Sequence, residues 1–425
     1  MTQPALFDVE LTNLVYGGDA IGRLPDGRAV FVPGVLPGEH ARVRLTEQKK
    51  GFARGVLVEL VQSSPDRVEV PPGCEGCHYA FMNYPAQLRF KTAILSDQLQ
   101  RIAGIQDPPV VPIVPSPQEW HYRNTVQFHL TPDGRLGFPQ QGSHNVIPVE
   151  DCLLCEPKIQ EVLPYLDFSS ELEGGQLPNP GLERIQVRAG ADDIMLVLES
   201  SDPVAPAFSV DFPISAVFVG PDGFDENEPI VLAGSDMLVM EVLGRAFRVS
   251  AGSFFQVNTA QAETMTRYLL DNLPITPASE VLEVYAGVGL FSAFIAPRVT
   301  QLTAVESAPS AVNDFTVNLD EFDNVSLYAG LAEEILPGLD LHPDVVLVDP
   351  PRAGLALPAL DALIKMEAPF LAYISCDPAT LARDVKRLAA AGYRLDRVQP
   401  FDMFPQTYHI ETICFLSHKD KLAPI

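Results

Sequence analysis

Residues 5–62 alternate between apolar and polar positions in short runs. Segments such as LFDVELTNLVYG, GRAVFVPGVL and EHARVRLTEQ each span about 8–12 residues and are separated by Gly, Pro and Asp. Alternation with a period of two is typical of strands that bury one face, and strands at this spacing are typical of a small β-barrel. The pattern therefore predicts a barrel here, with the basic KKGFARG segment as a loop.

The pattern is mixed between residues 63 and 250. Residues 85–104 carry apolar side chains at helical spacing, which predicts one amphipathic helix. WHYRNTVQFHL and RLGFPQ predict short strands, and one helix with several more strands follows. In the first of these strands, aromatic and hydrogen-bonding groups are mixed as on a surface for single-stranded bases, although a strand with one ordinary polar face explains them equally well. These residues are Trp120, Tyr122, Arg123 and Asn124.

From residue 251 onward, apolar strands alternate with helices, which predicts a parallel, doubly wound sheet. The helix is AETMTRYLLDNL, and the strands lie in SEVLEVYAGVGLF, QLTAVES, DVVLVDPP and FLAYISCDP. The closing segment YRLDRVQPFDMFPQTYHIETICFLSHK predicts two antiparallel strands around a polar turn. The chain is therefore predicted to be an α/β protein with a β-barrel (1–62), a central α+β domain (63–250) and a Rossmann-like domain (251–425).

Composition indicates the setting of the protein. Hydrophobic residues make up 47% of the 425, enough for large cores, yet no run of about 18 uninterrupted apolar residues occurs. The start MTQPALFDVELTN lacks the basic residues and apolar core of a secretory signal. These features predict a cytoplasmic protein with no membrane partner, and no feature implies a protein partner.

The formal net charge of −26 is unusual for a nucleic-acid-binding protein, which usually carries a basic face. Residues 1–62, however, contain seven Lys or Arg against seven acids, so the whole acidic excess lies beyond the predicted barrel. A local basic groove can coexist with a negative net charge. The negative net charge argues against strong non-specific binding to RNA but does not exclude a specific RNA-binding site.

Four of the six cysteines form two CxxC pairs, Cys74 with Cys77 and Cys152 with Cys155. In a reducing compartment such pairs indicate metal ligation rather than disulfides. Together they supply four thiolates, a set that suits zinc or an iron–sulfur cluster. The spacing does not choose between these metals, and four unrelated thiols are the alternative.

Side chains that suit a cofactor follow the strands of the last domain. Gly287 and Gly289 lie between a strand and a helix, where a missing side chain lets a ligand approach the backbone. Glu306 ends the next strand, near the position where an acid binds ribose hydroxyls in dinucleotide-type folds. The full GxGxxG pattern is absent, so S-adenosylmethionine fits better than a nicotinamide cofactor. Asp349 would form the far wall of the same crevice.

A candidate nucleophile follows the fourth strand. Cys376 lies beside a helix N-terminus that Asp377 can cap and Pro378 can begin. The partial positive charge there favours a thiolate over a thiol. Taken alone, such a cysteine is more often a small buried hydrophobic residue. Glu411, from the closing pair of strands, is expected across from it as a base.

A thiolate, a carboxylate base and a sulfonium methyl group in one crevice suit methylation of carbon 5 of uracil. That carbon is a poor nucleophile until a thiolate adds at carbon 6 and turns the ring into an enolate that attacks the methyl group. A base must then remove the carbon-5 proton so that the cysteine can leave.

Six short motifs make the last domain resemble the RNA uracil-C5 methyltransferase family. They are FFQVN (254–258), VLEVYAGVGLF (281–291), AVE (304–306), DPPR (349–352), SCDP (375–378) and FDMFPQTYHIE (401–411). In the barrel, the order YGGDAIGR, VFVPGVLPGE and KKGFARG resembles a TRAM domain, an RNA-binding barrel. The resemblance covers most of the chain and is dense only after residue 250.

The resemblance implies that Cys376 is the nucleophile and Glu411 the base. It also implies four contacts to S-adenosylmethionine, from Gln256, Tyr285, Glu306 and Asp349. For the cysteine pairs it implies a [4Fe-4S] cluster, with zinc as the alternative. Because family members with this domain order mostly act on ribosomal RNA, 23S rRNA is expected as the substrate rather than tRNA.

Two departures from the family pattern bear on these expectations. The usual cluster motif is C-x5-C-x2-C with one distant cysteine, whereas no cysteine precedes Cys74 and Cys155 follows Cys152, the expected distant ligand. Either Cys155 replaces the missing ligand, or the centre is incomplete or holds zinc. A GDAE-like segment expected at the adenine reads GLAE, so Leu331 offers no side-chain hydrogen bond there.

Other functions remain open from the residues. Enzymes that methylate exocyclic or side-chain nitrogen often have an aromatic residue after the two prolines, where this chain has Arg352, and they need no thiolate. A C5-cytosine enzyme would use the same thiolate addition. A scaffold that binds RNA or metal without turnover suits the acidic balance but leaves the combination of Cys376, Glu411 and Asp349 unexplained.

Overall fold

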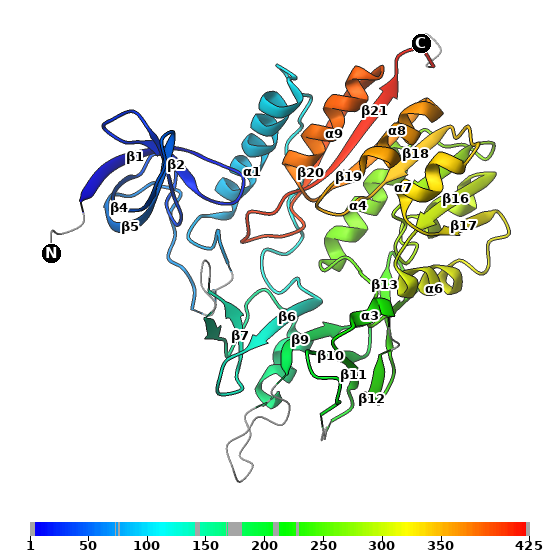
Figure 1. The fold of residues 1–425 in the computed structure, drawn as a ribbon, viewed down its shortest axis with the longest axis horizontal. Helices are drawn as coiled ribbons and strands as arrows, with labels where there is room; N and C mark the ends of the chain where they lie inside the picture. Colours follow the sequence, from blue (N-terminus) through cyan, green and yellow to red (C-terminus); the bar gives the residue numbers. More distant parts are fainter. Residues whose placement is uncertain are drawn as a thin grey trace.

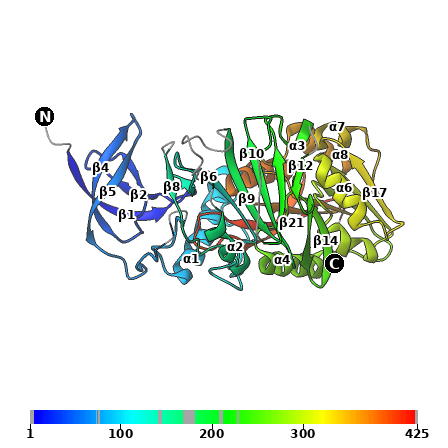
Figure 2. The ribbon, with the colours of Figure 1, turned by 90° about the horizontal axis from the view of Figure 1, so that it is seen from below.

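The structure, a computed structural model, describes residues 5–72, 74, 77–140, 145–166, 168, 181–206, 212–226 and 229–421. Figure 1 shows a β-barrel beside a larger body that contains two sheets and their helices. Seen from below, the barrel lies at one end of an elongated molecule (Figure 2). Among the described residues, no helix is long and apolar enough to span a membrane.

The predicted barrel is confirmed as five closed strands in the order β1-β2-β3-β5-β4. Strand β1 shows the alternation, because Val9 and Leu11 are buried while Asp8 and Glu10 are exposed. Side chains alternate across a strand, so one face fills the barrel and the other meets solvent. The strands are β1 Leu6–Leu14, β2 Ala20–Arg23, β3 Ala29–Val32, β4 His40–Gln48 and β5 Phe52–Gln62.

A mixed sheet of seven strands forms the middle of the molecule, in the order β12-β11-β10-β9-β6-β7-β8. Its core includes Phe128, Ile185 and Leu196. The strands are β6 Thr125–Leu130, β7 Leu136–Pro139, β8 Val146–Pro148, β9 Leu182–Ala189, β10 Ile194–Ser200, β11 Ser215–Val219 and β12 Ile230–Ala233. Short helices accompany them: α2 Pro157–Val162, a 3₁₀ turn Leu163–Tyr165 and α3 Gly223–Glu226.

The C-terminal sheet has seven strands in the order β17-β16-β15-β18-β19-β21-β20. The first five run parallel and β21 runs antiparallel to its neighbours, which confirms the doubly wound domain and its closing strand pair. The strands are β15 Glu280–Val284, β16 Gln301–Glu306, β17 Val325–Ala329, β18 Val345–Val348, β19 Phe370–Ser375, β20 Tyr393–Phe401 and β21 Glu411–His418. The helices are α4 Thr259–Asn272, α5 Ser292–Ile295, α6 Pro309–Asn318, α7 Ala332–Ile335, α8 Leu357–Met366 and α9 Pro378–Ala390, with 3₁₀ turns Ala296–Arg298 and Leu336–Gly338.

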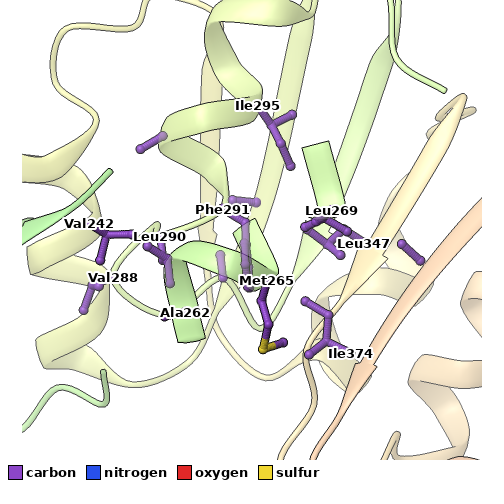
Figure 3. Packing of buried hydrophobic residues seen from close by; sticks show 14 of the residues in the cluster. Val242, Ala262, Met265, Leu269, Val288, Leu290, Phe291, Ile295, Leu347 and Ile374 are labelled. Carbon is purple, nitrogen blue, oxygen red and sulfur yellow. The ribbon is translucent and has the colours of Figure 1, made fainter. Parts of the chain in front are cut away.

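Both faces of this sheet are buried, and successive strand residues serve alternate cores. Val281 and Leu347 pack on one face, whereas Leu282 and Val346 pack on the other. Burial on both faces explains why these strands are almost continuously apolar. Figure 3 shows part of the first core, which also contains Val242 from the hairpin β13 Met237–Val242 and β14 Arg245–Ser250.

The predicted amphipathic helix is present as α1 Tyr84–Gln98, continued by a π-helical turn Leu99–Ala103. It packs beside α9, and its residues Leu95 and Leu99 enter a core of the C-terminal sheet (Figure 1). The chain then runs along the edge of that sheet, where Val110 pairs with Val398 of β20. A segment from before the central sheet therefore completes the C-terminal domain.

The turn after β15 depends on glycine, and Gly289 is predicted to be the more sensitive of its two glycines. Gly289 has φ +87°, and a Cβ there would lie 2.3 Å from Leu319 Cδ1. Gly287 has φ +55° and no atom within 4 Å of the same position, so it is the matched control. Gly289→Ala is expected to cost about 1–3 kcal/mol more than Gly287→Ala in urea unfolding, because overpacking adds to the backbone penalty. Equal costs would show that packing around Gly289 is unimportant.

Candidate active site

Parallel strands bring the predicted site residues to one edge of the C-terminal sheet. Tyr285 and Asp349 directly follow β15 and β18. Glu306 ends β16, and Cys376 follows β19. The carboxyl ends of parallel strands meet at one edge, where α/β folds bind their ligands. Glu411 reaches the same edge from the opposite direction, because it begins β21, which runs antiparallel to β19.

A cavity of about 1220 Å³ opens at this edge. All six side chains predicted for catalysis or cofactor binding line it: Gln256, Tyr285, Glu306, Asp349, Cys376 and Glu411. Gln256 comes from the segment between β14 and α4, which Asn124 holds in place. The Asn124 side-chain amide donates to the backbone oxygen of Gln256 at 2.9 Å, and its backbone N–H donates to Val257 O at 2.9 Å. The structure thus brings the whole predicted set together.

Glu306 is held by backbone groups of the surrounding turns. Its carboxylate accepts hydrogen bonds from the N–H groups of Gly287 at 2.8 Å, Ser307 at 2.7 Å and Ala308 at 2.8 Å. Three such donors fix the orientation of the carboxylate. Tyr285, beside it, has φ +65°, a strained conformation of the kind that clusters at functional sites.

Glu283 is a buried acid that the sequence reasoning missed. It lies within β15, is completely buried, and accepts a hydrogen bond from the hydroxyl of Ser292. Burial raises its pKa to about 8, and the nearby charges of Asp349 and Glu306 act in the same direction. An acid inside the apolar strand VLEV was the available signal, since acids are rarely buried without a reason.

Asp349 also favours its protonated form. Burial and the charge of Glu306 raise its pKa to about 7. Glu411 is fully buried, and burial with the charge of Asp349 raises its pKa well above the ordinary range, while Arg352 opposes this effect. The cavity wall therefore concentrates acidic groups whose charges disfavour one another.

The surroundings of Cys376 oppose the thiolate that the sequence predicts there. Burial raises the pKa of Cys376 to about 12, and the charges of Glu411 and Asp349 add to the effect. The N-terminal N–H groups of α9 do not compensate, because the side chain of Asp377 accepts from Ala379 N and Thr380 N at 2.9 Å each. The helix terminus thus interacts with Asp377, and the thiol lies among acids.

Arg352 and His409 complete the cavity wall around Cys376. Arg352 is exposed, and its charge lowers the pKa of both Cys376 and Glu411. Burial, with Arg352 as the next cause, lowers the pKa of His409 to about 3. The imidazole of His409 is therefore neutral at physiological pH and offers both a donor and an acceptor.

Two residues of the suggested base-binding surface have structural roles. Tyr122 is buried and donates its hydroxyl hydrogen to Pro405 O at 2.9 Å. Asn124 is buried and anchors Gln256, as described above. Arg123, in contrast, places its guanidinium 5.9 Å from the ring centroid of Phe404, which lines the cavity. The ordinary structural interpretation is correct for Tyr122 and Asn124.

The four cysteines predicted to bind metal lie as two adjacent thiol pairs. Cys77 forms a hydrogen bond with Cys74 and is close enough to Cys152 for their charges to interact. A hydrogen bond from Cys155 lowers the pKa of Cys152. Within the described ranges, however, no three Cys, His, Asp or Glu side chains gather closely enough to hold a metal ion. The structure therefore shows the donor atoms near one another and does not show a metal centre.

Comparisons with known proteins identify the family. A model described as tRNA (Uracil-5-)-methyltransferase matches residues 236–419, and a TRAM domain model matches residues 6–58. A protein of Thermosynechococcus vestitus, named an uncharacterized RNA methyltransferase, is 34% identical over 98% of this chain and 98% of its own length. The chain belongs to the RNA uracil-C5 methyltransferase family. It is accordingly an RNA methyltransferase that depends on S-adenosylmethionine.

Further comparisons cover almost the whole methyltransferase. An uncharacterized RNA methyltransferase of Gloeobacter violaceus is 33% identical over 96% of this chain and 95% of its own. The crystal structure of Pyrococcus abyssi tRNA (uracil-54, C5)-methyltransferase in complex with S-adenosyl-L-homocysteine superposes with a TM-score of 0.74. It is 25% identical and covers 96% of this chain and 100% of that one.

The departure at GLAE lies on the wall of the methyltransferase cavity. Leu331 precedes α7, is 46% exposed and lines the cavity together with Glu333. An apolar side chain therefore occupies the position where an acid was expected.

Glu283 predicts a pH-dependent stability. Its pKa is about 8 in the folded protein against an ordinary 4.5, so the folded state holds an extra proton between these values and loses stability as the pH rises through them. Glu283→Gln removes this titration and keeps a hydrogen-bonding group for Ser292. Between about pH 4 and pH 8, the unfolding free energy of the variant is expected to rise relative to wild type by on the order of 4 kcal/mol.

Urea unfolding at a series of pH values measures this difference. Glu280→Gln is the matched control, because Glu280 is exposed at the start of the same strand. If Glu283→Gln and wild type changed in parallel with pH, Glu283 would not titrate in the way described.

Proposed function

We propose that this methyltransferase transfers a methyl group from S-adenosylmethionine to carbon 5 of a uridine in RNA through a covalent bond between Cys376 and carbon 6. The observation that carries the proposal is that Cys376 and Glu411 face the same cavity as Glu306 and Asp349. A nucleophile and a base on one side and a cofactor wall on the other are what this reaction requires.

The cofactor wall fits S-adenosylmethionine in shape and charge. The turn at Gly287 is open to a ligand, because nothing lies within 4 Å of the position where a side chain would begin. Glu306 is held with its carboxylate at the end of β16, where ribose hydroxyls are bound in related folds. Gln256, Tyr285 and Asp349 would make the remaining contacts. When bound, the cofactor supplies an electrophilic methyl group on a positively charged sulfur.

Cys376 would act first. Its thiol would lose a proton to solvent, favoured by the charge of Arg352, and the resulting thiolate would add to carbon 6 of uracil. The new C–S bond moves electron density to carbon 5, which then takes up the methyl group. Glu411 would accept the proton from carbon 5, after which the C–S bond breaks and Cys376 leaves with its electron pair. Burial suits Glu411 to this task, because a carboxylate with a raised pKa is a stronger base once it is ionised.

Arg352 would support both steps by its charge. It opposes the rise in pKa of Cys376 and of Glu411, so it favours the two ionised forms that the reaction uses. It follows Pro351 at the cavity mouth and is exposed, where an RNA phosphate can also reach it.

We propose 23S rRNA as the substrate, following the domain order noted for the family, with tRNA as the alternative. The Pyrococcus abyssi enzyme is named for tRNA and aligns with 96% of this chain, so domain order alone does not separate the two classes.

Labelled S-adenosylmethionine and total RNA from a strain that lacks the protein provide the direct test. After incubation, the RNA is separated by size and digested to nucleosides. Label in 5-methyluridine is expected, and the parent RNA assigns the substrate class. Label in another nucleoside would contradict the uridine assignment, and no label would favour a scaffold that binds RNA without turnover.

Replacing the two catalytic candidates is predicted to stop the reaction at different points. Cys376→Ala should abolish turnover and the adduct with 5-fluorouridine RNA, because no thiolate remains to attack carbon 6. Glu411→Gln should slow turnover about 10²–10⁴-fold while the adduct with ordinary RNA accumulates, because the carbon-5 proton is not removed. Denaturing gels with labelled RNA measure both effects.

The control for Cys376→Ala is Cys414→Ala, which removes a thiol buried in a core of the same sheet. It is expected to retain adduct formation. Full activity of Cys376→Ala would contradict the covalent mechanism.

We also propose that Cys74, Cys77, Cys152 and Cys155 bind a [4Fe-4S] cluster, with zinc as the alternative. Thiol donors in two adjacent pairs fit this ligation by their chemistry. Iron and sulfide in equal amounts are expected after anaerobic purification and should be lost in Cys152→Ser but kept in Cys414→Ser. Zinc alone would assign a zinc site, and the absence of bound metal would contradict both.

A further inference from the structure

The barrel reaches the residue that follows the proposed nucleophile. Tyr16, between β1 and β2, donates its hydroxyl hydrogen to Asp377 Oδ2 at 2.9 Å. The other oxygen of the same carboxylate accepts from Ala379 N and Thr380 N and caps α9. One oxygen of the Asp377 carboxylate therefore binds the barrel, and the other binds the start of α9. Since Cys376 is the preceding residue, this contact restrains the backbone that carries its thiol.

The barrel also encloses the residue that precedes the proposed base. Ile410 is completely buried, and it belongs to the core of the barrel together with Leu11, Val30 and Tyr79. The backbone nearby is tied as well, because Tyr79 N donates to Gln406 O at 2.9 Å. An isoleucine in a filled core has little freedom to shift. Glu411 follows it directly.

Aromatic rings connect the two contacts. The rings of Tyr16 and Tyr408 meet edge to face with centroids 6.3 Å apart, and those of Tyr408 and His409 are 4.4 Å apart. The barrel backbone also lies close to Tyr408, since a Cβ at Gly18 would lie 3.3 Å from Tyr408 Cδ1. His409 lines the cavity together with Arg352, Cys376 and Glu411. The barrel surface and the cavity wall are therefore continuous.

From these contacts we infer that the barrel positions Cys376 and Glu411, with Tyr16 as the positioning residue for Cys376. The inference rests on the catalytic roles proposed above. A barrel that only delivered RNA would offer its aromatic groups to solvent, whereas the Tyr16 hydroxyl is bound to Asp377 and Ile410 is enclosed. The geometry of the nucleophile depends on the barrel being docked.

Tyr16→Phe tests the inference, because it removes the hydroxyl and keeps the ring against Tyr408. Single-turnover methyl transfer at saturating RNA and cofactor is expected to fall about tenfold, the size of one lost hydrogen bond to a charged group. The KM values for RNA and S-adenosylmethionine should stay within about twofold of wild type, since no binding contact is removed.

Three variants assign the effect to the contact with Asp377. Tyr165→Phe is the matched control, because Tyr165 is 72% exposed in the central domain, and it should behave as wild type. Asp377→Ala removes the acceptor for Tyr16 together with the α9 cap. In that background Tyr16→Phe should have little further effect, because the two residues act through one bond. If the effects of the two substitutions on the rate were fully additive, the inference would be overturned.

The remaining outcomes separate this inference from the proposed function. Unchanged single-turnover rates in Tyr16→Phe, or an effect on the KM for RNA alone, would overturn the positioning role while uridine methylation stands. If wild type transferred no methyl group, the proposed function would fail, and the alkylation rate of Cys376 with iodoacetamide, mapped by mass spectrometry, would still test the contact. The alkylation rate of Cys376 is expected to change about threefold or more in Tyr16→Phe but not in Tyr165→Phe. Equal alkylation rates in wild type and Tyr16→Phe would overturn the inference.

Discussion

The active site depends on the pairing of β21 between β19 and β20. This pairing sets Ser375 opposite Thr412 and Phe401 opposite Glu411, so the start of one strand lies beside the end of another. A slip of one residue would turn every side chain of β21 to the opposite face. Because β21 is bonded on both edges and buried along its whole length, that slip is strongly disfavoured. The antiparallel strand β21 thereby brings Glu411 to the carboxyl edge of the parallel strands.

The electrostatics of the cavity depend on how few groups offset the negative charge of its acids. Glu306 has three backbone donors, whereas burial and neighbouring acids raise the pKa of Glu283, Asp349 and Glu411. A cavity of this kind favours a cation, because a bound positive charge stabilises the ionised acids. Binding of a cationic ligand is therefore expected to release protons from the protein, in the way that any ligand preferring one protonation state does.

Local patterns predicted much of the fold and part of the site. Alternation predicted the barrel, and the carboxyl ends of parallel strands predicted Glu306 and Asp349 at one edge. Gln256 and Tyr285 came from the resemblance to the family. Local patterns did not reveal the electrostatic effects that residues distant in sequence have on one another. The helix next to Cys376 is local and suggested a thiolate, but the acids that raise its pKa come from other strands.

Burial was the other property that the residue pattern did not reveal. Tyr122 and Asn124 have the composition of a binding surface, yet both point inward and hold the segments that carry Pro405 and Gln256. The bond from Tyr16 to Asp377 joins residues 361 positions apart, which no periodicity encodes. Such contacts follow only from the packing of the complete fold.

The enclosure of Ile410 has a consequence for biosynthesis. The strands of the barrel leave the ribosome before the closing strands, but part of their core is supplied by Tyr79, Ile94 and, much later, Ile410. Domains usually fold as units during synthesis, starting from the N-terminus. Here the nascent barrel would carry an unfilled apolar opening until the closing strands emerge. The barrel would therefore be made before the C-terminal sheet and be completed only when the last strands of that sheet emerge.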